Sequence, residues 1–102
     1  METKTLEVTD VRILLFKDGL DTGRVRAIAE ATVGGQLLLK GIRVMDGEGG
    51  LFVAYPHDPF YTGEDYRTLY APVTVEFRKA LEDAVLGKYR EETARNLAKG
   101  GR

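Results

Sequence analysis

The sequence predicts an α+β fold in which a small antiparallel sheet of four to five strands packs against a C-terminal α-helix. Two observations predict this fold class. The first two thirds of the chain alternate apolar and polar residues, with glycine-rich turn sequences between the alternating runs. The last third instead repeats apolar residues at intervals of three and four. We therefore expect a sheet followed by one amphipathic helix.

Two tight turns are predicted in the centre of the chain. The stretch Gly41–Pro56 contains Asp-Gly and Gly-Gly sequences before the apolar run Leu51–Ala54, which predicts two strands joined by a hairpin turn. Gly34-Gly35 predicts another two-residue turn, followed by a strand over Gln36–Met45. Gly41 interrupts that strand and predicts a β-bulge.

Two earlier runs, Leu6–Phe16 and Arg24–Val33, alternate as half-buried strands. One face of the second run is small, with alanines at positions 27, 29 and 31. Small side chains predict that something bulky, most simply the helix, packs closely over that face. In the first run we expect Thr9, Val11, Ile13 and Leu15 on one face and Val8, Asp10, Arg12 and Leu14 on the other.

The helix is predicted to begin after Thr74, a suitable N-cap. The periodic pattern fades past Tyr89, so we expect a single domain over residues 1–92 and a flexible or marginally helical tail over 93–102. The predicted core stripe consists of Phe77, Ala80, Leu81, Ala84, Val85 and Tyr89.

Several surface features precede or flank the core stripe. Residues 56–65 are predicted to form a surface loop, and Tyr66–Ala71 a short edge strand.

The run Leu37–Leu39 is continuously apolar and is expected to be covered. Val75 and Leu86 are expected on the far side of the helix, either as scattered exposed residues or as a second contact surface in a dimer.

The composition limits the classes of protein to which the chain can belong. The 102 residues carry a net charge of −1 and no cysteine, so disulfides and thiolate metal sites are excluded. No apolar run approaches the roughly 20 residues that span a bilayer, and the first residues lack the apolar core of a signal peptide. We expect a cytoplasmic protein with no membrane partner.

Catalytic chemistry finds little support in the chain. His57 is the single histidine, and its polar surroundings, Pro-His-Asp-Pro, are typical of a loop residue. Histidines and carboxylates do not cluster at metal-ligand spacing, and the glycines after Asp46 lie between two strands rather than where a phosphate-binding loop would. We therefore expect no enzyme, no catalytic residue, no metal, no cofactor and no small-molecule substrate.

The charge is unevenly spread along the chain. Residues 72–102 carry seven basic and five acidic groups, whereas the preceding residues have an acidic excess. The C-terminal third is thus the part that favours phosphate. Arg12, Arg24 and Arg26 fall on the outward strand faces, where they form either a phosphate-binding patch or a solvated surface beside Asp10 and Glu30.

Three segments together resemble the SpoVG family, the stage V sporulation protein G or septation regulators. The central block Arg43-Val44-Met45-Asp46-Gly47 followed by Gly50-Leu51-Phe52-Val53-Ala54-Tyr55-Pro56 is the most specific of them. Glu7–Arg12 precedes it, and Asp83–Leu86 before Tyr89 follows it. The resemblance extends from about Glu7 to Tyr89.

This resemblance implies a small α+β, non-enzymatic homodimer that binds DNA or RNA and influences septum formation, cell division or sporulation gene expression. Arg67 carries over, because Gly63-Glu64-Asp65-Tyr66-Arg67 matches the family's Gly-Glu-x-x-Arg. The family's basic pair does not carry over, since His57 and Asp58 stand near those positions. The nucleic-acid contacts expected here are Arg67, Arg78, Lys79, Lys88 and Arg90.

Two features leave the binding mode open. The loop after Pro56 is acidic, with Asp58, Glu64 and Asp65, which favours the alternative of a protein-interaction module of the division machinery that does not bind nucleic acid. Phe60-Tyr61 in the same loop offers either a stacking surface for single-stranded bases or local packing.

Overall fold

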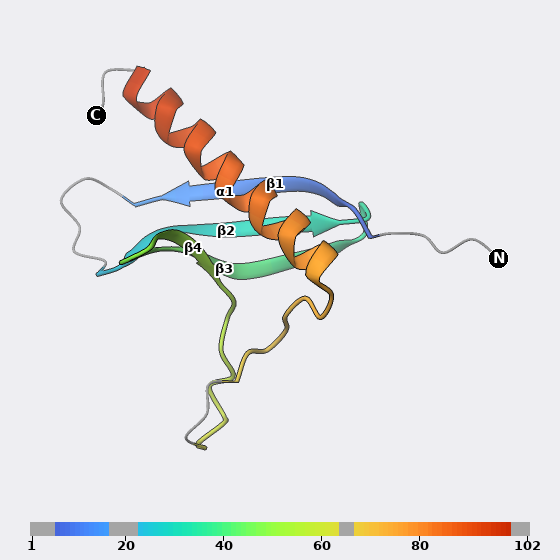
Figure 1. Ribbon diagram of the computed structural model, residues 1–102. Coiled ribbons are helices and arrows are strands. Elements are labelled where there is room, and N and C mark those ends of the chain that lie inside the picture. The colour runs from blue at the N-terminus through green and yellow to red at the C-terminus, as the bar shows by residue number, and fades with distance from the viewer. Residues whose placement is uncertain (1–5, 17–22, 64–66, 99–102) are drawn as a thin grey trace.

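A computed structural model describes residues 6–16, 23–63 and 67–98 of the chain. Four strands form one antiparallel sheet in the order β1-β2-β3-β4, and the helix α1 crosses one face of it (Figure 1). The predicted α+β class is confirmed. The elements are β1 (Val8–Leu15), β2 (Val25–Val33), β3 (Leu37–Gly47), β4 (Gly50–Ala54) and α1 (Val75–Ala98).

The core lies between α1 and the alanine face of β2. Ala27, Ala29 and Ala31 are fully buried, as are Leu81 and Val85 of α1. The absence of bulk on β2 lets the helix approach closely, so that two branched side chains fill the space above three methyl groups. This confirms the prediction that the small face of β2 is covered by the helix. Ile42, Val44, Val53 and Tyr55 complete the buried cluster.

Glycines shape the sheet at two predicted places. Gly34 and Gly35 have φ values of 60° and 67°, and the Gln36 amide donates to the Val33 carbonyl at 3.1 Å, so the predicted turn is present. Val33 pairs with Leu37, so Gln36 belongs to the turn and β3 begins one residue later than predicted. Gly41 has a φ of 83°, and the β2–β3 register shifts beside it. The predicted bulge is therefore present. Any other residue at this position would be strained.

A second register irregularity corrects one prediction. The β1–β2 pairing shifts between Val8 and Asp10, so the simple alternation of sides breaks at this point. Val8 consequently packs against the core together with Val11 and Ile13, although alternation alone placed it on the opposite face. Asp10, Arg12 and Leu14 are exposed, as predicted.

The start of α1 agrees with the sequence, and its later course does not. The Phe77 amide donates to the Thr74 hydroxyl at 3.1 Å, which confirms the N-cap. Ala80 of the predicted core stripe is exposed, and Leu86, expected on the far side, packs against the core instead. The helix continues unbroken through residue 92 to Ala98, so the described part of the tail expected over 93–102 takes the helical one of its two predicted forms.

The segment between β4 and α1 leaves the body of the protein and returns to it (Figure 1). The strand predicted over residues 66–71 is absent from its described part, where a single antiparallel bridge joins His57 and Thr68. We call residues 56–63 and 67–69 the arm. The helical part that the structure describes contains no segment long and apolar enough to cross a membrane.

Candidate nucleic-acid interface

The five basic residues expected to contact nucleic acid do not gather in one place. Arg67 lies on the arm, and Arg78, Lys79, Lys88 and Arg90 lie on α1. The arm and the C-terminal half of α1 extend past opposite edges of the sheet (Figure 1). A single copy of the chain therefore presents two separate candidate surfaces.

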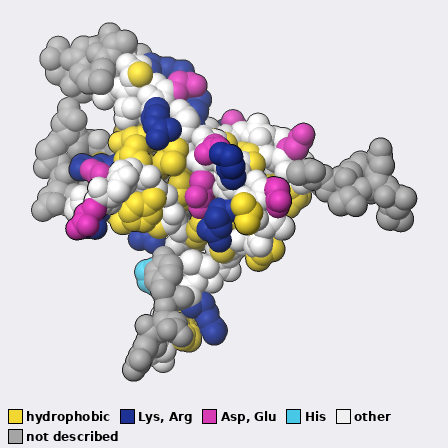
Figure 2. Space-filling view, in the orientation of Figure 1, with side chains coloured by type: hydrophobic (Ala, Val, Ile, Leu, Met, Phe, Trp, Pro, Cys, Tyr) yellow, Lys and Arg dark blue, Asp and Glu magenta, His cyan; other side chains and the backbone are white. Residues whose placement is uncertain are grey.

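Three of the four helix cations are paired with carboxylates of the same helix. Lys79 bonds Asp83 at 3.0 Å, and Arg78 lies 3.4 Å from Glu82. Basic and acidic side chains accordingly alternate on the face of the molecule that α1 covers (Figure 2). These pairs follow from spacings of three and four residues, which bring side chains together on a helix. Lys88 contacts both Glu91, at 3.1 Å, and Glu92, at 3.5 Å.

Arg78 also has a structural role at the base of the helix. Its guanidinium donates to the Pro72 carbonyl at 3.0 Å and lies 5.9 Å from the centre of the Tyr55 ring. The Tyr55 hydroxyl donates to the Glu82 carboxylate at 3.0 Å. Burial, reinforced by this hydrogen bond, raises the pKa of Tyr55 above its ordinary value. Arg78 thus joins α1 to the residues that precede it, besides carrying a charge.

Pairing also affects the cations further along α1. The hydrogen bond to Glu91 raises the pKa of Lys88, because the carboxylate favours its charged form. Arg95, which sequence reasoning did not single out, contacts Glu91 at 3.4 Å and Glu92 at 3.3 Å. Arg90 is exposed, and within the described part of α1 it is the cation without an ion pair.

The arm is held together by its backbone. The Asp58 amide donates to the Arg67 carbonyl at 2.8 Å, and the Leu69 amide donates to the Pro56 carbonyl at 2.7 Å. The Arg67 guanidinium lies over the Tyr61 ring, 4.3 Å from its centre. Phe60, by contrast, is 90% exposed. Of the two readings of Phe60-Tyr61, local packing therefore fits Tyr61 but not Phe60.

Of the three arginines predicted on the outward strand faces, two are paired, and Arg24 is exposed in the turn just before β2. Arg26 contacts Asp46 at 2.8 Å, and Arg12 lies 3.7 Å from Asp10. His57 is exposed, and its backbone forms the bridge to Thr68. Among the residues that the structure describes, no three His, Cys, Asp or Glu side chains are grouped closely enough to hold a metal ion.

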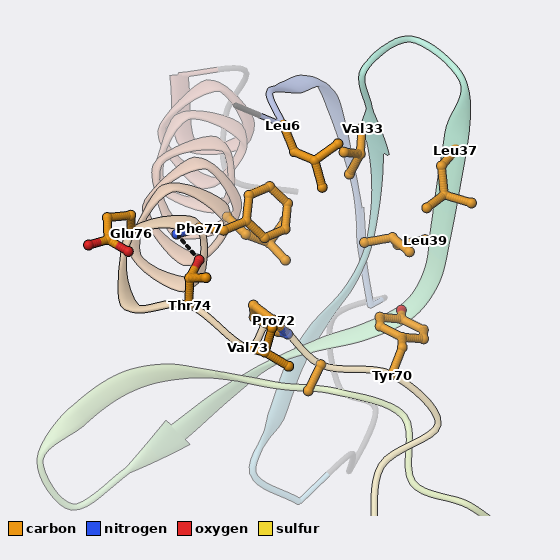
Figure 3. A pocket seen from close by; sticks show the side chains of 12 residues that line it. Leu6, Val33, Leu37, Leu39, Tyr70, Pro72, Val73, Thr74, Glu76 and Phe77 are labelled. Carbon is orange, nitrogen blue, oxygen red and sulfur yellow. Dashed lines mark hydrogen bonds between the residues drawn. The ribbon is translucent and has the colours of Figure 1, made fainter. Parts of the chain in front are cut away.

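An apolar groove, which sequence reasoning did not predict as a whole, opens between the β2–β3 hairpin and the start of α1. Its volume is about 660 Å³. Val33 and Leu39 lie across the hollow from Phe77, and Glu76 points away from it (Figure 3). Leu37 at its rim is 57% exposed and Val73 is 95% exposed. The run Leu37–Leu39 was the sequence signal for this surface, since it predicted an apolar region that needs covering.

Comparison with known proteins identifies the family of this chain. A model of one protein family, SpoVG, matches residues 6–91 of the chain. The chain belongs to the SpoVG family. It is 42% identical to the "Putative septation protein SpoVG" of Priestia megaterium, over 82% of this chain and 83% of that protein.

Two further relatives carry the same name. The protein of Bacillus subtilis (strain 168) is 40% identical over 82% of each chain. That of Finegoldia magna is 39% identical over 85% of this chain and 77% of its own length. The matched region includes all four strands, the arm and most of α1.

Proposed function

We propose that this SpoVG-family chain is a non-enzymatic, dimeric regulator that acts in the cytoplasm on septum formation, cell division or sporulation gene expression and binds DNA or RNA. The observation that carries the proposal is the family match across both the sheet and the helix, with relatives named as septation proteins. The nucleic-acid part rests on the cations of α1 and on Arg67.

Internal pairing weakens, but does not abolish, the attraction of α1 for phosphate. Surface ion pairs at i,i+4 spacing stabilise a helix by only about 0.3–0.5 kcal/mol, so a phosphate can compete for Lys79 or Arg78 at small cost. Arg90 needs no such exchange, because it has no ion pair within the described part of α1. We therefore expect Arg90 to contribute more to phosphate binding than Lys79 does.

Dimerisation is supported by the apolar groove. Its lining carries no charge that points inward, and its rim exposes Leu37 and Val73 to solvent. Contiguous apolar surface of this kind is typical of protein contacts rather than of an isolated monomer. A second copy of the chain is the proposed partner, and light scattering across a wide concentration range tests it. A monomeric mass at all concentrations contradicts this part of the proposal.

Nucleic-acid binding is tested by titrating labelled DNA and RNA at several salt concentrations. The logarithm of the binding constant should fall linearly with the logarithm of salt concentration, with little sequence preference. Arg90→Ala should weaken binding at low salt and reduce the salt slope by about one. Lys79→Ala is the matched control on the same helix and should change less. No binding at low salt by the unaltered protein contradicts the proposal.

A second function is favoured by the same charge pattern. Because most described cations of α1 are neutralised internally and the groove is apolar, the chain also suits a protein-interaction module of the division machinery. Pull-down with and without nuclease separates the two. Partners that remain after nuclease treatment favour the protein-interaction module.

A further inference from the structure

We infer that the arm is a base-stacking site for single-stranded nucleic acid, in which the Phe60 ring receives a base and Arg67 contacts the adjoining sugar–phosphate. This inference rests on the proposed nucleic-acid function. It specifies single-stranded nucleic acid as the ligand and the arm as the place where it binds. It differs from the phosphate contacts proposed for α1, since the aromatic side chain contributes more than charge does.

The arm is held in shape by its own hydrogen bonds. Its two backbone runs are joined by the Asp58–Arg67 and Leu69–Pro56 hydrogen bonds, at 2.8 and 2.7 Å. At its outer end the Asp58 carboxylate accepts a hydrogen bond from the Phe60 amide at 2.9 Å, and the Tyr61 amide donates to the Asp58 carbonyl at 3.3 Å. The backbone that carries Phe60 is therefore fixed before any ligand binds, which lowers the entropic cost of binding.

Among the residues that the structure describes, Phe60 has no packing role that accounts for it. Its side chain is 90% exposed, and it is not part of the core or of the residues packed against the core. An exposed ring forgoes the stabilisation that burial of such a side chain provides. Both faces of an aromatic ring can stack on a nucleobase, and this stacking tolerates any base sequence. The position suits a single strand, because duplex DNA and RNA keep their base faces stacked on one another.

Tyr61, the residue after Phe60, holds the Arg67 side chain in place. Its ring folds back over Gly63, where a Cβ would overlap the Tyr61 hydroxyl, so the lack of a side chain at Gly63 allows this arrangement. The Arg67 guanidinium lies over the Tyr61 ring, 4.3 Å from its centre. Arg67 is thereby held in place with its charge on the same element as Phe60.

The charge of the arm favours stacking over electrostatic attraction. Asp58 is engaged in the turn, and Arg67 is the one Lys or Arg of the arm. The sequence adds Glu64 and Asp65 between the two runs of the arm. Binding at the arm should therefore neutralise about one phosphate, with a salt slope near −0.7, the value expected for each contact to a single strand.

The test uses the fact that the chain has no tryptophan. Phe60→Trp places a single indole on the arm, and its fluorescence should be quenched by oligo(dT) or oligo(rU) but not by a duplex of equal length. In anisotropy titrations with the same labelled oligonucleotides, Phe60→Ala should weaken single-strand binding by about fivefold to a hundredfold. Val75→Ala, at another exposed apolar residue outside the arm, should leave it unchanged.

Gly63→Ala provides an independent variant, because it displaces Tyr61 without removing Phe60 or Arg67. It should weaken single-strand binding while leaving the circular dichroism spectrum unchanged. Equal affinity of Phe60→Ala and unaltered protein, with no quenching in Phe60→Trp, overturns the arm site but leaves phosphate binding by α1 intact. A change in Phe60→Trp fluorescence with protein concentration alone places the ring at an interface between copies and also overturns it. Loss of all nucleic-acid binding by the unaltered protein at low salt removes the proposed function as well.

Discussion

The helix α1 and the arm both project from the sheet, but they offer a ligand opposite kinds of surface. On α1 most described charges already have partners, with carboxylates three or four residues away. On the arm charge is sparse, and the exposed feature is the Phe60 ring. The number of basic residues is thus a poor guide to binding in this chain, because local spacing decides which of them remain available.

The two regions are also held in place differently. One side of α1 is fixed by buried side chains, above all Leu81 and Val85, against the alanine face of β2. The arm is held by the two backbone hydrogen bonds of the His57–Thr68 bridge, by the turn hydrogen bonds to Asp58 and by the stack of Arg67 on Tyr61. Changes in the core should therefore alter global stability, whereas changes on the arm should alter binding with little effect on stability.

Truncation of the core side of α1 should have the largest effect. Leu81→Ala removes a fully buried side chain over Ala27, Ala29 and Ala31 and leaves a cavity, so the free energy of unfolding should fall by about 2–5 kcal/mol. Urea denaturation followed by circular dichroism measures this. Val75→Ala, on the same helix but 78% exposed, is the control and should stay within about 0.5 kcal/mol. A loss below 1 kcal/mol for Leu81→Ala would show that α1 is not fixed by this contact.

The base of the arm should be the next most sensitive place. Gly41 has a φ of 83°, and an added Cβ would lie 3.4 Å from the Pro56 Cβ, where the arm begins. Gly41→Ala should destabilise the protein by about 1–2 kcal/mol, the usual cost of a side chain in the left-handed region. The midpoint of thermal unfolding measures this. An unchanged midpoint would mean that the bulge can relax without straining the chain.

The sequence predicted the sheet, its turns and the start of α1, because these depend on local signals such as alternation, glycine pairs and the Thr74 cap. The predictions of whether Val8, Ala80 and Leu86 face the core were wrong. A register shift in β1 determines the orientation of Val8, and the line of contact between α1 and the sheet determines that of Ala80 and Leu86. Neither is a local property of the sequence. Among the candidate cations, Arg78 and Lys79 could be matched to their carboxylates by i,i+4 spacing.

Other features of the candidate sites depend on contacts between distant residues. The exposure of Phe60 could not be predicted, since a loop aromatic is buried or exposed according to what the loop lies against. The groove brings Leu6, Leu37 and Val73 together from three separate stretches of the chain. The stack of Arg67 on Tyr61 likewise depends on how the arm folds back.

A smaller effect is expected where the arm, the sheet and α1 meet. Tyr55→Phe removes the hydrogen bond to Glu82 and should cost about 0.5–1.5 kcal/mol near pH 7. Because burial raises the pKa of Tyr55 in the folded protein, its contribution is fully present below the unfolded value of about 10 and is lost as the pH rises above it. The variant should therefore lose stability less steeply above pH 10, measured by urea denaturation at successive pH values. Some dependence should remain, since burial also raises the pKa of Tyr70. Identical pH profiles for the two proteins would contradict the assignment to Tyr55.

A glycine-to-alanine substitution on α1 should raise stability, whereas Gly41→Ala should lower it. Gly87 lies within the helix, and a Cβ built there meets no atom within 4 Å. Gly87→Ala should therefore stabilise the protein by about 0.5–1 kcal/mol, because alanine loses less backbone entropy than glycine in a helix. Thermal unfolding of the two alanine variants side by side checks the opposite signs. If Gly87→Ala also lowers the midpoint, the space beside Gly87 must be occupied in solution, and the surface of α1 that faces β1 would then belong to an interface rather than to solvent.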